Sequence, residues 1–164
     1  MERIQPRQLP RIDLFAFYFI LVGGTALTLW GTRDYFLPGR IHSFMLERLE
    51  LASESWWRYT LLTHVVGSQL CLLASLLQYS RLVLKRVPWL HRNLGRIYAL
   101  CIITVVFPTG VALAFVAKGG FSGMLGFLVL AFGTLLTLLL GMVAIYRKKL
   151  RAHQAWISRS FGPV

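Results

Sequence analysis

Long runs of apolar residues constrain this chain more than any other feature of it. A helix needs about 20 predominantly apolar residues to cross the ~30 Å hydrocarbon core of a bilayer. Segments that approach or exceed that length are 13–30, 59–79, 96–116 and 123–146. Because lipid offers no partner for backbone N–H and C=O groups, helices are the spanning elements to expect. We therefore predict an all-α, polytopic transmembrane bundle with four spanning helices.

The four predicted spans use most of the 164 residues, so we expect one membrane domain over 1–164 and no separate soluble domain. After the fourth span, residues 153–164 would cover only about 18 Å as a helix, too little to cross the bilayer. Two alternatives stay open there: an interfacial stub, or a truncated fifth helix. The third span is expected to start after Pro88, a residue suited to the first turn of a helix. Pro108 predicts a kink near its middle.

The first outer loop, roughly 31–57, contains a helical pattern. Its apolar face consists of Ile41, Phe44, Met45, Leu49, Ala52 and Trp56, and its acidic face of Glu47, Glu50 and Glu54. We predict one short amphipathic helix lying on the outer surface. Trp56, Trp57 and Tyr59 follow it and are expected to mark the membrane interface.

Small and polar residues form stripes on two of the spans. The second span carries Thr60, His64, Ser68, Cys71, Ser75 and Gln78 on one face, and the fourth carries Gly126, Gly133, Thr137 and Ala144, flanked by Gly141. Because such stripes are normally packing faces, we expect these two helices to approach each other closely or to flank something flat. Cys71 and Cys101 have no motif context and are interpreted as free buried thiols.

Basic residues are concentrated on one side of the predicted membrane. That side carries Arg3, Arg7, Arg11, Arg81, Lys85, Arg86, Arg92, Arg96, Arg147, Lys148, Lys149, Arg151 and Arg159. The other side carries Arg33, Arg40, Arg48, Arg58 and Lys118. The positive-inside rule then places the N-terminus in the cytoplasm, in an inner (plasma) membrane.

All six acidic residues lie within the first 54 positions. From Ser55 onward no carboxylate is present to act as a general acid, general base or hard-cation ligand. Partners of that part should be anionic, and anionic lipid headgroups explain the charge most simply. Nucleic acid is not expected, because the charge sits on short juxtamembrane loops. The sequence also contains no nucleophilic triad, phosphate loop or dinucleotide fingerprint, and it leaves open whether the chain is an enzyme.

Histidines are the candidate functional residues. His64 lies within the second span, where an ionisable residue is a functional candidate by default. His91 begins the third span, with Gly95 on the same face and Arg92 and Arg96 beside it. His153 follows the fourth span on the same membrane side, and Arg159 comes two turns later.

Two neutral imidazoles from different helices can be the axial ligands of a haem iron. Arginines near the aqueous edge suit its propionates, and glycine provides a flat slot. We therefore predict haem b as the cofactor, with His91 and His153 (and His64) as candidate ligands. Arg92, Arg96 and Arg159 are the candidate propionate or anion contacts, and Gly95 lines the slot. No other metal site is expected. The same residues would also suit lipid-headgroup contacts.

Three motifs together resemble the bacterial multi-pass membrane family called domain of unknown function 2306. They are an early span histidine (His64), then "LHRNLGRIY" from Leu90 to Tyr98, then "HQAWISRS" from His153 to Ser160. The family usually has arginine where Gln154 stands. The name implies no established activity, and members usually continue into further helices.

A more distant similarity is to the six-helix, ascorbate-reducing b-type cytochromes, which carry haem between paired histidines on a four-helix core. The order of His91 and His153 is similar to one such pair. A second pair would need a histidine in the fourth span, and none lies between Lys118 and Arg151. The resemblance thus implies at most one bis-histidine site.

Three functional hypotheses stay open from the sequence. The first is a b-type haem electron-transfer module with a membrane redox partner. The second is a non-catalytic scaffold or partner subunit, or a homo-oligomer, that binds anionic lipid. The third is a small-solute transporter, which the kink at Pro108 would allow.

Overall fold

The computed structural model describes residues 11–37 and 40–160, and every regular element in these ranges is a helix. The all-α prediction is confirmed for this part of the chain. Arg3 and Arg7, which the orientation argument used, lie outside the described residues.

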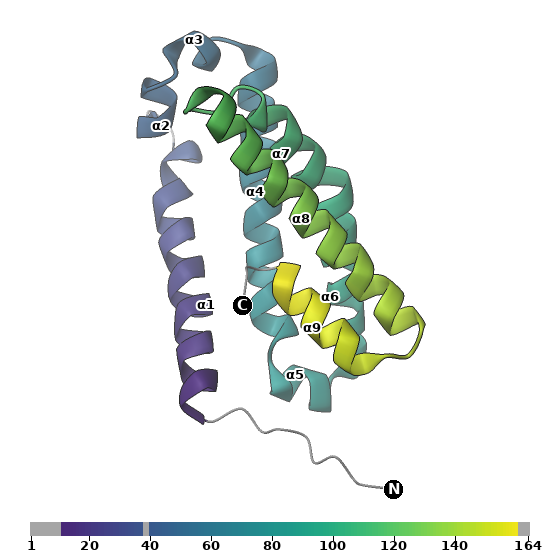
Figure 1. The fold of residues 1–164 in the computed structure, drawn as a ribbon. Helices are drawn as coiled ribbons and strands as arrows, with labels where there is room; N and C mark the ends of the chain where they lie inside the picture. The colour runs from purple at the N-terminus through teal and green to yellow at the C-terminus, as the bar shows by residue number, and fades with distance from the viewer. Residues whose placement is uncertain (1–10, 38–39, 161–164) are drawn as a thin grey trace, which may run out of the picture.

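Long helices form the body of the molecule (Figure 1). They are α1 (Arg11–Thr32), α4 (Ser55–Gln78), α8 (Gly120–Tyr146) and a third span built from α6, η2 and α7. Three of them, Ser55–Gln78, Pro88–Ala114 and Gly120–Tyr146, are long and apolar enough to cross a membrane. The span expected over 13–30 stays a prediction, although α1 is helical there and packs against α4.

The helix of the third span begins at Pro88, as the proline predicts, and so eight residues before the apolar run that starts at position 96. Pro88 occupies its first turn, where a missing N–H costs nothing, and α6 (Pro88–Cys101) follows from it. A π-helical turn, η2 (Ile102–Val106), then leads into α7 (Phe107–Ala114). The Phe107 N–H bonds the Ile102 carbonyl, five residues back. The irregularity expected at Pro108 is therefore a widened turn just ahead of the proline.

The polar stripe of α4 faces the third span. A Cβ on Gly67 would lie 2.8 Å from Val105 Cγ1, so the two helices come close there. The core beside this contact consists of Cys71, Tyr98, Ala99, Ile102 and Leu138.

The expected close approach of the second and fourth spans is wrong. A Cβ built on Gly126 or Gly133 meets nothing within 4 Å. α8 packs instead against α7 and against α9 (Leu150–Ser160). Because lipid and the protein interior are equally apolar, a stripe of small residues does not indicate which helix packs against it.

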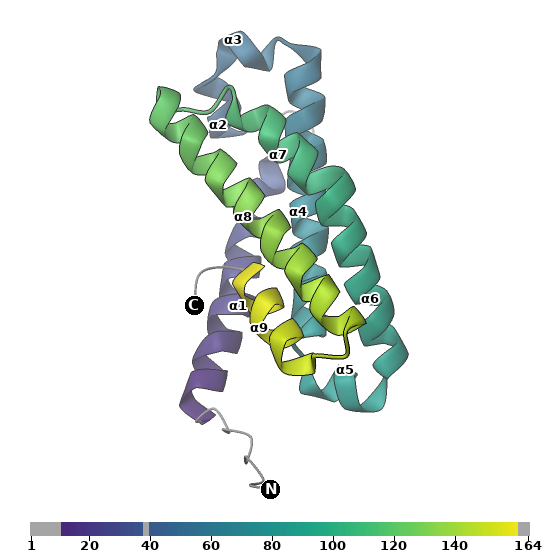
Figure 2. The ribbon, with the colours of Figure 1, turned by 45° about the vertical axis from the view of Figure 1, so that its right-hand side comes forward.

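The last described helix, α9, folds back along α8 at the end of the bundle that also carries α5 (Arg81–Arg86), as both views show (Figure 1, Figure 2). The chain reverses through Arg147–Lys149, with Lys148 at a left-handed φ of 58°. Ile157 packs against the core and Ser160 is buried. At about 16 Å, α9 is too short to cross the bilayer, and it packs into the bundle.

The outer loop differs from the predicted single amphipathic helix. It forms η1 (Arg33–Tyr35) and two one-turn helices, α2 (Ser43–Leu46) and α3 (Leu49–Ala52). The break falls at Arg48, whose backbone leaves the helical region at φ −134° and ψ 47°. Trp57, expected at the interface, is 1% exposed and stacks on Phe44.

Candidate functional site

His91 lies in the first turn of α6, at the end of the bundle that holds α5. Its ring nitrogen Nδ1 is buried and has no hydrogen-bond partner. A buried polar atom without a partner costs about 1–3 kcal/mol, so it marks a place where a ligand could bind. The His91 carbonyl oxygen accepts a hydrogen bond of 2.6 Å from the Gln78 side-chain amide at the end of α4.

His153 lies in the first turn of α9. Its Nδ1 is 2.9 Å from the carbonyl oxygen of Gly141 on α8. Because a carbonyl only accepts, this nitrogen must carry the proton. The ring's other nitrogen, Nε2, then presents its lone pair. A backbone carbonyl that fixes the tautomer in this way is the usual support of a metal-binding histidine.

The two imidazoles are close enough to interact electrostatically. They come from helices separated by the whole of α8, and α9 brings them together by folding back to the end where α6 begins (Figure 2). The structure therefore brings the two predicted histidines to the same end of the bundle.

Gly95 lies one turn after His91, but it does not leave an open slot. A Cβ at Gly95 would lie 3.3 Å from Gln78 Nε2, so the amide of Gln78 fills the space beside it. Gln78 is thus a site residue that the sequence placed only on a packing face.

The predicted arginines are exposed, and they differ in position. Arg92 follows His91 directly, and Arg96 is 3.5 Å from the Asn93 side-chain oxygen. The Arg159 guanidinium stacks on Trp156, 4.8 Å from the ring centre. It lies six residues beyond His153, about 9 Å along α9. Of these three predicted arginines, Arg92 and Arg96 therefore lie closer along the chain to a member of the histidine pair than Arg159 does.

His64 stands apart from the pair. Its Nδ1 is 2.9 Å from the Thr109 hydroxyl, which itself donates to the Val105 carbonyl at 2.6 Å. The Gly110 backbone packs against the ring, because a Cβ there would lie 3.1 Å from His64 Cε1. Along α4, His64 is about 21 Å from Gln78, the residue beside His91. It does not share a site with His91.

Two tyrosines hold α9 in place, and sequence reasoning missed both. Tyr79, just after α4, donates a hydrogen bond of 3.5 Å to the Ile157 carbonyl, and Tyr98 of α6 interacts with Ser160. Burial raises the pKa of Tyr79 to about 12, so it remains a neutral phenol. In the sequence, an aromatic residue at the end of a span is also typical of a residue that anchors the helix at the membrane interface. Nothing in the sequence therefore distinguished that role from a contact with α9.

Within the residues that the structure describes, no group of three or more His, Cys, Asp or Glu side chains could hold a metal ion. A ligand-poor site of two imidazoles is compatible with haem, because the porphyrin supplies four nitrogens itself.

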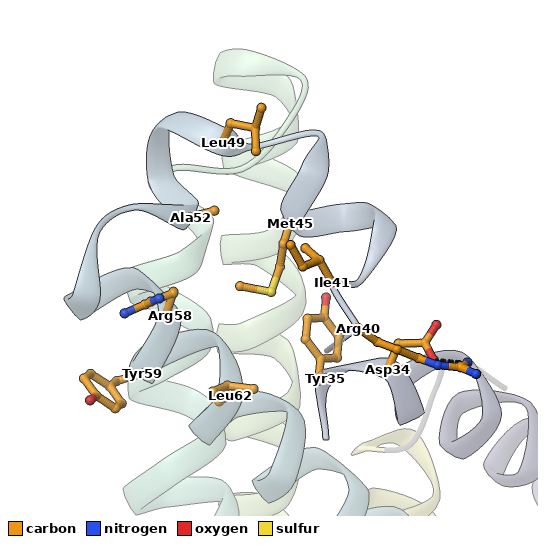
Figure 3. Close-up of a pocket in the computed structure, with 10 residues that line it drawn as sticks. All are labelled: Asp34, Tyr35, Arg40, Ile41, Met45, Leu49, Ala52, Arg58, Tyr59 and Leu62. Carbon is orange, nitrogen blue, oxygen red and sulfur yellow. Dashed lines mark hydrogen bonds and ion pairs between the residues drawn. The ribbon is translucent and has the colours of Figure 1, made fainter. Parts of the chain in front are cut away.

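A separate cavity of about 400 Å³ lies at the outer end, between the loop helices and α4. Figure 3 shows Met45 and Leu62 beside it, and Asp34 paired with Arg40 at its edge. Burial raises the pKa of Tyr35 in its wall. Its lining is mostly apolar, and the histidine pair lies at the opposite end of the bundle.

Comparison with known proteins gives one result. The family model described as "Predicted membrane protein (DUF2306)" matches residues 61–162. This range includes α4 from Leu61, the third span, α8 and α9, and so all of the candidate histidines. No curated protein and no solved structure matches the chain.

Proposed function

Because the chain belongs to the DUF2306 family of predicted membrane proteins, we propose a function within the bilayer: it binds one b-type haem between His91 and His153 and carries electrons. Membership confirms the resemblance drawn from the three motifs, and it makes the chain a membrane protein of unknown function. Haem binding is our own extension from the geometry of the two histidines.

The observation that carries the proposal is the buried, partnerless Nδ1 of His91 within electrostatic range of His153. The Gly141 carbonyl occupies only one nitrogen of the His153 ring, so each of the two imidazoles keeps a nitrogen for a ligand. The same carbonyl orients His153 so that Nε2 is the nitrogen available to a ligand. These residues fit a bis-imidazole site, provided that the Gln78 side chain moves from the space beside Gly95.

Each residue has a definite role in this proposal. His91 and His153 would hold the iron, and Arg92 and Arg96 would neutralise the propionates at the aqueous edge. Arg159 is a further anion contact at greater distance. When bound, the iron would alternate between the ferric and ferrous states and so carry one electron. The protein's own contribution is to fix the imidazoles and exclude water.

Absorption spectroscopy tests the proposal. Protein purified from haem-supplied cells should show a Soret band and about one haem per chain, as expected for a single bis-histidine site. The band should be lost in His91→Ala and in His153→Ala. His42→Ala is the matched control, because His42 lies in the outer loop, where it caps α2. His64→Ala should also keep the band.

Circular dichroism and gel filtration would show that each variant is folded. A colourless wild-type preparation would overturn the proposal, as would a full Soret band in folded His91→Ala protein.

A second function is favoured by the charge distribution. The salt bridges among the described residues all join side chains of the outer loop or the α7–α8 turn: Arg33, Asp34, Arg40, Glu47 and Lys118. At the other end, exposed cations such as Arg92 and Arg96 lie in a part of the sequence without acids. Anionic lipid headgroups would neutralise them, which also agrees with an inner membrane and a cytoplasmic N-terminus.

Native mass spectrometry from mixed-lipid nanodiscs tests this alternative. The wild-type protein should retain phosphatidylglycerol over phosphatidylcholine, and the Arg92→Gln/Arg96→Gln variant should retain less. Equal retention of both lipids by the wild-type protein would refute it.

A further inference from the structure

The two cysteines of the chain lie across one helix contact. Cys71 is on α4 and is 5% exposed, whereas Cys101 ends α6 and is only partly buried. Cys71 belongs to the core cluster, and Cys101 packs against that cluster. Both are free thiols, and the proposed haem site uses neither.

The backbones come close at this contact. A Cβ on Gly67 would lie 2.8 Å from Val105 Cγ1 and 3.2 Å from Val106 Cγ2. Cys101 Sγ is 3.5 Å from the Gly67 carbonyl oxygen, one helical turn before Cys71. Cys71 and Cys101 also interact electrostatically. Together with the shared core cluster, these contacts place the two cysteines on facing sides of one helix contact.

Adjacent thiols can bind a soft metal or form a disulfide. The described residues offer these two thiols no third His, Cys, Asp or Glu ligand, which disfavours most metals. A disulfide needs Cα atoms about 4.4–6.8 Å apart, and Gly67, which lies against Val105 and Val106, lets the two helices approach closely beside the cysteines. A disulfide is also neutral, so the apolar core tolerates it.

We propose that Cys71 and Cys101 form a reversible disulfide between α4 and α6 within the membrane, and that a lipid-soluble quinone is the oxidant. Two S–H bonds break and one S–S bond forms. The two electrons and two protons pass to the quinone, which becomes the quinol.

The oxidant class follows from the depth of the pair. Cys71 lies about 10 Å along α4 from its end at Gln78, inside a span. Charged oxidants that cannot enter the bilayer do not reach this depth, whereas quinones dissolve in the hydrocarbon core. Cys101 is the more exposed sulfur, so it is the one that the quinone would meet.

The disulfide also lies beside the residues that position α9. Tyr98, which interacts with Ser160, belongs to the same core cluster as Cys71. The proposal does not depend on haem, and it is tested on both wild-type and His91→Ala protein for that reason.

The experiment uses full-length protein in lipid nanodiscs, incubated without oxygen with a short-tailed benzoquinone. The protein is then unfolded, alkylated with a maleimide and digested with trypsin. The peptides 59–81 and 97–118, which carry the two cysteines, should be recovered joined and unalkylated. One quinol should form per chain.

Cys71→Ser and Cys101→Ser are the matched controls, and each should leave the remaining thiol alkylated. Diamide, a permeant azo oxidant, provides a quinone-independent route to the same disulfide. Full alkylation of both cysteines after quinone and also after diamide would overturn the disulfide. Cross-linking by diamide but not by quinone would overturn the choice of oxidant.

Discussion

Replacement of Gly141 by alanine should loosen α9, since α9 comes very close to α8 at this residue. The new Cβ would lie 2.7 Å from Ile157 Cδ1 and 2.9 Å from its Cγ1, well inside ordinary contact. Either the isoleucine must change its rotamer in the core or α9 must move outward. His153 would then lose its fixed distance to the Gly141 carbonyl.

The magnitude follows from overpacking, which costs about 1–3 kcal/mol. Alanine also favours helix over glycine by about 1 kcal/mol, but α8 stays helical whether α9 is docked or released, so this gain cancels. Because 1.4 kcal/mol is a factor of ten in an equilibrium constant, the released population should rise about 5- to 150-fold.

Thiol labelling measures this population. Ser160 is 7% exposed at the end of α9, so Ser160→Cys reports on undocking when Cys71 and Cys101 are replaced by alanine. With fast reclosing, the rate of maleimide labelling follows the open fraction. We expect it to increase in Gly141→Ala by the factor given above.

Two further variants make the test specific. Gly133→Ala adds the same methyl group to α8, but nothing lies within 4 Å of it, so the labelling rate should stay unchanged. Ile157→Val removes Cδ1 and should restore part of the docking in Gly141→Ala, because Cγ1, 2.9 Å from the new Cβ, remains. An unchanged rate in Gly141→Ala, or an equal increase in Gly133→Ala, would refute the reasoning.

Three other predictions concern separate contacts. Gly67→Ala should lower the free energy of unfolding by about 1–3 kcal/mol, seen as a lower Tm, and Val105→Ala should partly rescue it because Val105 is the clashing residue. Thr109→Val leaves His64 Nδ1 without its partner and should cost about 1–3 kcal/mol, whereas Thr109→Ser should keep the wild-type Tm. Lys118 lowers the pKa of Glu47. The stabilisation from this ion pair is therefore present above the ordinary Glu pKa and is lost as the pH falls through the lowered pKa of Glu47. A ¹³C NMR titration should show an ordinary pKa for Glu47 in Lys118→Met, and a lowered pKa in that variant would contradict the pairing.

The spans were predictable because they depend on a local property. Apolar length alone placed the second span at 59–79, against Ser55–Gln78, and the fourth at 123–146, against Gly120–Tyr146. The apolar run of the third starts late, at position 96, because His91, Arg92 and Arg96 interrupt its hydropathy, whereas Pro88 predicted the helix start correctly. Helix formation depends on backbone hydrogen bonds, and Pro88 starts it regardless of those charges.

The candidate site was predictable only as a set of residue types. The motifs selected His91 and His153, but their proximity depends on α9 folding back, and no local pattern encodes that reversal. It rests on Gly141 meeting Ile157 and on the tyrosine contacts to α9. The contact between the Gln78 side chain and Gly95 likewise could not be predicted from the sequence, because both residues lie on ordinary helix faces.

The sequence by itself determined that the chain is helical, that its spans are apolar, and that its acids are confined to one part. These are properties of composition and spacing. They follow from the sequence because the apolar lipid requires apolar spans and the backbone hydrogen bonds require helices. Only the tertiary structure decided which glycines lie at contacts between helices. Gly67 and Gly141 meet neighbouring side chains, whereas Gly126 and Gly133 meet none. In a bilayer every helix face finds apolar surroundings, so the choice of neighbour is made by shape and not by hydrophobicity.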